Sequence, residues 1–261
     1  MLVLAHPGHE LFVYEWMRRA RPAVHILTDG RSRAGQSRID ECRAVVESCG
    51  ASCGALFGRF SDGQVYSWLL AGEHGPLLEW CDDLTSEIIA ARPEVLVGDA
   101  CERQYLTHDI CRLLIDAAVE RAANALDSPI ACYSFPMYGY CGDASALRPR
   151  REITIELDEA TLTAKQRAAV SYTDTGLRTE TDWFLEARGR DWFGLERLME
   201  SAAWNRAAAG ETGPPAYEEL GRRLVEQGVY ERAVTFRGHV VPFAEALAAA
   251  TQRGGDLRCA S

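Results

Sequence analysis

The chain has 261 residues, of which 47% are hydrophobic and 25% are charged. This composition is that of an ordinary globular protein, and the length suits one large α/β domain or one domain with an appendage. The formal net charge of -10 argues against a protein that grips phosphate backbones, so nucleic acid is not an expected partner.

The sequence also indicates the cellular compartment of the protein. No stretch reaches the roughly 18 apolar residues that a membrane span requires, and the opening run, 1–5, is too short for the apolar region of a signal peptide. The nine cysteines contain no CxxC pair, which favours reduced, mostly buried thiols. We therefore expect a cytoplasmic protein without a membrane partner.

In the first half of the chain, short apolar runs alternate with amphipathic segments. The predicted strands span residues 2–5, 24–27, 95–97 and 130–133, and the predicted helices span residues 9–20, 36–49, 76–91 and 107–125. Pro93 and Pro129 each fall between a helix and the next strand, where proline marks a boundary. This βαβα order predicts an α/β protein with a Rossmann-like, doubly wound and mainly parallel sheet.

Beyond residue 150 the pattern weakens. We predict a strand at 153–157 and a helix at 159–171, followed by a helix at 217–227 and a short strand or hairpin at 234–243. The stretch 210–215, rich in glycine and proline, is the best linker candidate. We therefore expect an α/β domain over 1–172 and a mixed helical C-terminal extension or cap over 173–261, packed on the same domain.

Histidines follow two of the predicted strands. His6 and His9 come directly after the first strand, and His108 comes a few residues after the 95–97 strand. Ligands of open parallel sheets bind beyond the carboxyl ends of the strands. The spacing of His6 and His9, with Pro7 and Gly8 between them, matches what a metal needs. If these strands are neighbours, the three imidazoles converge.

Five short motifs carry a resemblance to a known family, the LmbE/PIG-L N-acetylglucosaminyl deacetylases. They occur in the family's order and cover about residues 1–172. Ala5–Glu10 resembles the AHPDDE signature, Thr28–Gly30 the TDG turn, Arg38–Glu41 the RxxE segment, Thr107–Asp109 the end of the HPDH motif, and Lys165–Ala168 the KxxA segment.

The resemblance implies a Rossmann-like fold, a Zn²⁺ cofactor and a set of site residues. It makes His6 and His108 metal ligands and places His9 where the family has a ligating aspartate. It also makes Arg38 and Asp29 substrate-binding residues. The sequence departs from the family at two positions. Gly8 replaces the aspartate that acts as general base, and Tyr105 takes the place of the first histidine of HPDH.

These departures suggest how the chemistry would change. Three neutral imidazoles around zinc are typical of sites whose bound water has a pKa of about 7, so zinc-bound hydroxide could form without a dedicated base. Tyr105 could donate to the developing oxyanion, and Asp99 or Glu102 could act as base or acid. Asp99 could instead cap a helix, and Glu102 could be solvated. Glu10 would contact a ligand histidine, not the metal itself, and so orient that histidine.

Two functions of different classes follow. The first is a metal-dependent amide hydrolase, similar to a deacetylase, that acts on an acylated amino sugar or a related small metabolite. The alternative is a catalytically inactive binding or scaffold protein of the same fold. A dinucleotide-dependent enzyme is disfavoured because the loop 6–10 has one glycine and no GxGxxG pattern. The sequence leaves a homo-oligomer open.

Overall fold

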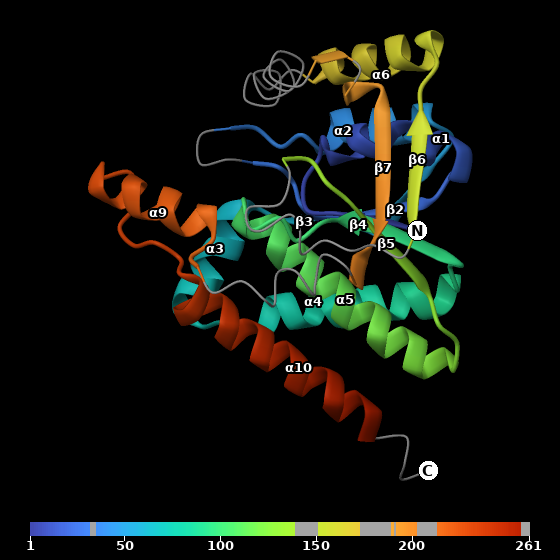
Figure 1. The fold of residues 1–261 in the computed structure, drawn as a ribbon. Coiled ribbons are helices and arrows are strands. Elements are labelled where there is room, and N and C mark those ends of the chain that lie inside the picture. Colours follow the sequence, from blue (N-terminus) through green and yellow to red (C-terminus); the bar gives the residue numbers. More distant parts are fainter. Residues whose placement is uncertain (32–34, 139–150, 173–188, 191, 203–212, 257–261) are drawn as a thin grey trace.

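The structure is a computed structural model that describes residues 1–31, 35–138, 151–172, 189–190, 192–202 and 213–256. Its centre is one sheet with the strand order β3-β2-β1-β4-β5-β7-β6 (Figure 1). The strands are β1 (Leu2–Leu4), β2 (Ala23–Thr28), β3 (Ser52–Phe60), β4 (Val95–Asp99), β5 (Ala131–Phe135), β6 (Glu152–Glu156) and β7 (Leu195–Glu200). Strands β1 to β5 run parallel, and β7 is antiparallel to β5 and β6. The predicted doubly wound, mainly parallel sheet is confirmed.

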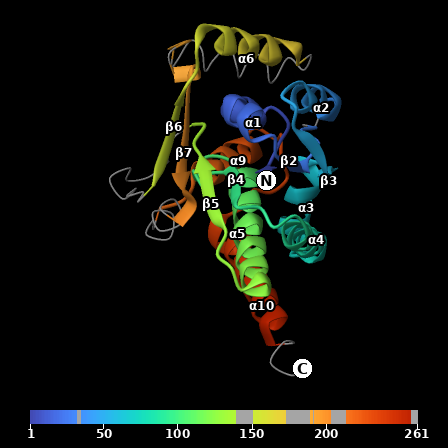
Figure 2. The ribbon, with the colours of Figure 1, turned by 90° about the vertical axis from the view of Figure 1, so that its right-hand side faces the viewer.

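Helices cover both faces of the sheet (Figure 2). One face carries α1 (Tyr14–Ala20), α2 (Ile39–Ser48) and α6 (Glu159–Ser171). The other carries α3 (Asp62–Ala71), α4 (Gly75–Ala91), α5 (Leu106–Leu126), α9 (Ala216–Glu226) and α10 (Val241–Asp256). Two shorter helical segments complete the chain, the 3-10 helix η1 (His9–Val13) and the π-helical turn η3 (Phe236–Val240).

Strand β1 shows why two layers of helices are needed. Leu2 and Leu4 point to the core beneath α1 and α2, whereas Val3 and Ala5 point to the core beneath α4 and α5. All four side chains are fully buried. Alternate residues of a strand face opposite sides, so a strand that is apolar throughout must be covered twice.

Two strands and two helices lie wholly or mostly where the sequence predicts no element. Strand β3 and helix α3 fill residues 52–71, and β7 lies in the predicted extension but pairs with β5 and β6. Helix α10 packs against α5. Residues on both sides of the predicted boundary at 172 thus share one sheet.

The predicted strand or hairpin at 234–243 is wrong, because this stretch is helical. The β-branched residues there suggested a strand, but the Thr235 side chain accepts a hydrogen bond from Gly238 N and caps a helical turn. Pro242 has no N–H to donate to the carbonyl four residues earlier, and the turn before it is the π-helical turn η3. The linker candidate 210–215 lies partly outside the described residues, and Pro215 precedes α9.

Two expectations about the compartment can be compared with the structure. Among the described residues, no helix combines the length and the apolar character needed to cross a lipid bilayer. Seven of the cysteines are described, and all seven are free thiols.

Candidate metal centre

The three histidines meet at the carboxyl edge of the sheet. Strand β1 lies between β2 and β4, so the connections from the middle of the sheet leave toward opposite sides and open a crevice there. His6 follows β1, His9 begins η1, and His108 lies in the first turn of α5 after β4. The predicted convergence of the three residues is therefore observed, because β1 and β4 are neighbours.

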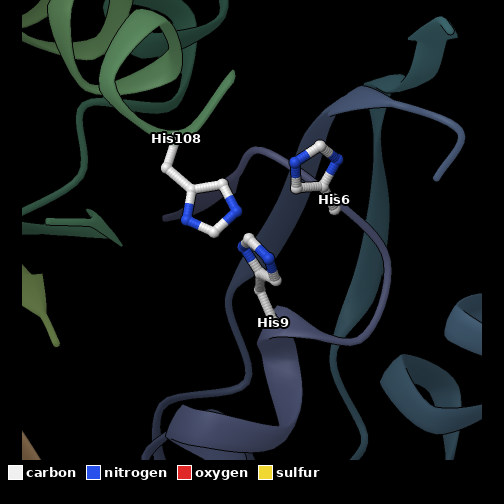
Figure 3. A group of neighbouring side chains, drawn as sticks. All are labelled: His6, His9 and His108. Atoms are coloured by element: carbon white, nitrogen blue, oxygen red, sulfur yellow. The ribbon is translucent and has the colours of Figure 1, made fainter. Parts of the chain in front are cut away.

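Figure 3 shows the three imidazole rings pointing toward one another. One ligand atom from each residue can be chosen so that all three atoms lie within 4.8 Å of one another. The ring centroids of His6 lie 5.0 Å from those of both His9 and His108, and the His9 and His108 centroids are 4.5 Å apart. This spacing could hold a metal ion.

Hydrogen bonds determine which nitrogen of His6 carries its proton. Thr28 Oγ1 lies 2.8 Å from His6 Nδ1 and donates its own proton to the Ala5 carbonyl at 3.0 Å. The hydroxyl has one proton, so it must accept from His6 Nδ1–H. The lone pair of neutral His6 is then on Nε2, which is free to bind a metal.

Asp99 acts in the same way on His9. Its Oδ1 lies 2.6 Å from His9 Nδ1, and its Oδ2 accepts the Ala5 N–H at 2.5 Å. Burial alone would raise the pKa of Asp99, but its contacts with His9, His108 and the Ala5 amide outweigh this and lower the pKa. The ionised carboxylate can only accept, so it holds His9 with the proton on Nδ1 and the lone pair on Nε2.

The third histidine of the cluster, His108, is also buried. Burial and the neighbouring His9 lower the pKa of His108 to about 3, and burial also lowers the pKa of His6 well below its usual value. Among the described residues, His108 Nδ1 has no hydrogen-bond partner. Metal ions bind neutral imidazole, so the two shifts favour the ligand form. Three neutral imidazoles are a donor set that fits Zn²⁺.

The residues expected to act as acid, base or oxyanion donor lie in different surroundings. Both Asp99 oxygens are used in the bonds described above, and Glu102 accepts hydrogen bonds from the backbone N–H groups of Met137 and Tyr138 at 3.0–3.3 Å. Tyr105 lines the pocket beside the histidines and is 40% exposed. Its ring centroid lies 5.2 Å from that of His108.

Glu10 is fully buried on the far side of the loop. Its carboxylate accepts hydrogen bonds from Gly8 N, at 2.7 Å, and from the Tyr172 hydroxyl. Asp99, rather than Glu10, is thus the carboxylate that hydrogen-bonds to His9. The described bonds of Glu10 hold the loop that carries His6 and His9. The backbone of Gly8 itself has φ 104°, a conformation that favours glycine.

The two residues expected to bind substrate also differ in position. Arg38 lines the pocket, but Asp29 does not. Asp29 Oδ1 accepts the Arg31 N–H at 2.9 Å, and its backbone carbonyl accepts the Arg38 N–H at 3.0 Å. Asp29 therefore bonds to the backbone of both Arg31 and Arg38.

The histidines open onto a cavity of about 840 Å³. One residue of its wall, Asp62, was not anticipated from the sequence. Asp62 begins α3, and its Oδ1 lies 3.3 Å from His6 Nδ1. Burial raises the pKa of Asp62 to about 6, although Thr107 and Arg38 oppose the shift. The capping pair of Ser61 and Gln64 is the sequence signal that could have located this helix start.

Comparison with known proteins rests on structure. The sequence matches no protein-family model and no curated protein. The solved structure of the A40926 pseudoaglycone deacetylase Dbv21 is similar, with a TM-score of 0.50 and 15% identity over 76% of this chain and 96% of that chain.

Two structures of teicoplanin deacetylases are also similar to this chain. A deacetylase–bog complex from the teicoplanin biosynthesis pathway matches at TM-score 0.49 and 14% identity, over 76% of this chain and 96% of that chain. The zinc-inhibited form of teicoplanin deacetylase Orf2 matches at TM-score 0.46 and 12% identity, over 90% and 95%. At such identities the likeness concerns the fold alone: the chain has the α/β fold of the A40926 deacetylase, which agrees with the LmbE-like fold that the sequence resemblance implies.

Proposed function

We propose that this protein is a metal-dependent amide hydrolase that removes the acyl group from an acylated amine, such as an amino sugar or a related small metabolite. The observation that carries the proposal is the cluster of His6, His9 and His108 at the edge of a cavity large enough for a small molecule. Because Thr28 and Asp99 contact Nδ1 of His6 and His9, the Nε2 lone pairs of these two histidines are free to bind a metal. Zn²⁺, when held there, supplies Lewis acidity toward the amide carbonyl and toward water.

Hydrolysis adds water across the C–N bond, so one proton must leave the water and one must reach the departing amine. Because Gly8 stands at the position of the family's base, another residue must accept the proton that leaves the water. Asp62 is a carboxylate of the pocket wall next to His6. We assign Asp62 Oδ1 the role of taking the proton, directly or through one water, and returning it to the amine nitrogen.

We assign the remaining task to Tyr105. The amide oxygen becomes negative when the carbonyl carbon turns tetrahedral, and a hydroxyl donor in the pocket can stabilise it. Tyr105 lines the pocket next to His108. Asp99 and Glu102, expected as acid or base, are better suited to hold His9 and the segment at Met137 and Tyr138, because their carboxylates accept hydrogen bonds there.

The test is release of a primary amine from a panel of N-acetylated sugars by the zinc-loaded protein. We expect turnover by the unaltered chain, none by His108→Ala, and losses in kcat of about 100-fold for Asp62→Asn and for Tyr105→Phe. Asp83→Asn removes an exposed carboxylate that pairs with Arg59, and it should leave turnover unchanged.

Two results would overturn the proposal. Full activity of His108→Ala would show that the cluster is not the active centre. A folded, zinc-loaded protein that releases no amine from any compound of the panel would favour the binding or scaffold protein instead.

A further inference from the structure

The wall of the cavity combines segments that are far apart in the sequence. Arg38 precedes α2, whereas Tyr230 and Arg232 lie between α9 and η3. The Tyr230 ring centroid is 6.2 Å from that of Tyr66 in α3. The segment between α9 and η3 therefore forms part of the same pocket as the histidines, although it lies outside the part of the chain that carries the family resemblance.

The Arg38 guanidinium has a defined position in the wall of the pocket. Its guanidinium lies against Gly30, where an added Cβ would sit 2.6 Å from Nε and 2.9 Å from Nη2. Among the described residues, Arg38 forms no ion pair, and its buried Nε has no hydrogen-bond partner. A buried donor without a partner is unfavourable, so this arrangement is suited to a ligand that supplies the acceptor.

Arg232 is a second arginine of the pocket wall. It is exposed at the rim, and no ion pair within the described part of the chain includes it. The whole chain has 38 acidic and 28 basic residues, so carboxylates were available to neutralise it. The acidic groups of the wall are Asp62 and Glu231, and neither lies within ion-pairing distance of Arg38 or Arg232.

We propose that the substrate carries an anionic group, a carboxylate or a phosphate, away from its acylated nitrogen, and that Arg38 and Arg232 bind this group. The proposal rests on the proposed amide hydrolysis for the acylated nitrogen, but the anion site itself needs no metal. Guanidinium groups bind carboxylate and phosphate with paired, charge-assisted hydrogen bonds, and such geometry selects a substrate more sharply than a diffuse positive field would.

Binding to the metal-free protein, measured by calorimetry, tests the proposal without any turnover. The probes share one acylated amino sugar: neutral N-acetylglucosamine, its 6-phosphate, and N-acetylmuramic acid, which carries a carboxylate. We expect at least one anionic probe to bind 10- to 100-fold more tightly than the neutral sugar. The phosphate and carboxylate arms show which anion is preferred, and the preference should weaken as salt is added.

Variants distinguish binding of the anion by the two pocket arginines from a general effect of positive charge on the protein surface. Arg232→Gln and Arg38→Gln should each remove most of the preference. Arg223→Gln removes one positive charge from an exposed position of α9 and should leave the preference intact. Equal binding of neutral and anionic probes, or equal losses in Arg232→Gln and Arg223→Gln, would overturn the proposal.

Failure of this proposal can be told apart from failure of the proposed function. If the zinc-loaded protein hydrolyses neutral N-acetyl sugars and shows no preference for anions, the anion site is wrong and the hydrolase stands. If the metal-free protein prefers the anionic probes but the loaded protein hydrolyses none of them, the anion site stands and the hydrolase is wrong.

Discussion

Asp99 connects two strands through one carboxylate, because its Oδ1 accepts from His9 Nδ1 at 2.6 Å and its Oδ2 accepts from Ala5 N at 2.5 Å. The end of β4 thus holds both the backbone that leaves β1 and a histidine of the loop that follows. This is the arrangement in which a carboxylate orients a metal-binding imidazole and increases its basicity.

We predict that Asp99→Asn weakens zinc binding by about 10- to 100-fold. The amide of asparagine can donate as well as accept, so it no longer requires His9 to keep its proton on Nδ1. Competition with a coloured chelator measures the dissociation constant, and Asp83→Asn serves as the control for an exposed carboxylate. Unchanged zinc affinity in Asp99→Asn would show that the contact with His9 has no role in metal binding.

Gly8 cannot be replaced without a structural cost. Its φ of 104° is disfavoured for any residue with a Cβ, by about 1–2 kcal/mol in left-handed conformations. We predict that Gly8→Ala and Gly8→Asp each lower the free energy of unfolding by that amount, measured in urea.

Gly75→Ala is the matched control for Gly8, because an added Cβ there meets nothing within 4 Å. Restoring the family's aspartate at position 8 should therefore not be a simple gain. If Gly8→Asp were as stable as the unaltered chain, the strain argument would be wrong.

His25 predicts an acid-sensitive contribution to stability. It is fully buried in β2, and burial lowers its pKa to about 4. Between pH 6.5 and 4 the unfolded chain binds a proton at this site and the folded chain does not, so stability falls as the pH falls, by up to about 1.4 kcal/mol per pH unit. Neither ring nitrogen has a hydrogen-bond partner within the described residues.

The comparison is with His25→Leu, which cannot be protonated. Between pH 6.5 and pH 5 the unaltered chain should lose about 2 kcal/mol more unfolding free energy than the variant. Urea unfolding at the two pH values provides both numbers. Parallel losses in the two proteins would mean that His25 does not cause the acid sensitivity.

The buried ion pair of Lys165 and Glu196 predicts an effect on the free energy of unfolding. Lys165 Nζ lies 3.2 Å from Glu196 Oε1, and both residues are buried. Glu196 also accepts the N–H groups of Glu15 and Trp16, so the pair connects α6, β7 and α1. We predict that Lys165→Met costs about 3–5 kcal/mol of unfolding free energy, because it leaves a buried carboxylate without its charge partner.

The double variant Lys165→Met, Glu196→Gln should recover part of that loss, because it removes the buried charge as well. Thermal and urea unfolding of the three proteins measure the difference. A single variant as stable as the unaltered chain would contradict the structural role of this ion pair.

The sequence predicted the parts of the fold whose patterns are local. The parallel strands β1, β2, β4 and β5 are short, mostly apolar runs, and prolines mark the boundaries before β4 and β5. Strand β3 was not predicted from the sequence, because Gly54 and Gly58 interrupt it and because its pairing with β2 has register shifts. Strand β7, Leu195–Glu200, has the sequence Leu-Glu-Arg-Leu-Met-Glu, which does not alternate apolar and charged residues. It is identified mainly by its pairing with β5 and β6.

The site was predictable to a similar extent. His6, His9 and His108 could be placed because each follows a strand, and neighbouring parallel strands end at the same edge. Asp62 and Arg232 could not, since the pocket receives them from α3 and from the segment after α9. The role of Asp99 required the actual geometry, because a carboxylate at a strand end can act on substrate or hold a ligand.

The most direct test of the account is the number of zinc ions that the purified protein binds at neutral pH. We predict one ion per chain, lost in His108→Ala and retained in the control His239→Ala, whose histidine bonds within its own helical turn. Cobalt substitution should give the absorption of a four-coordinate site in the unaltered chain. A chain that binds no metal under zinc-replete conditions, or a His108→Ala variant that binds it equally well, would contradict the account.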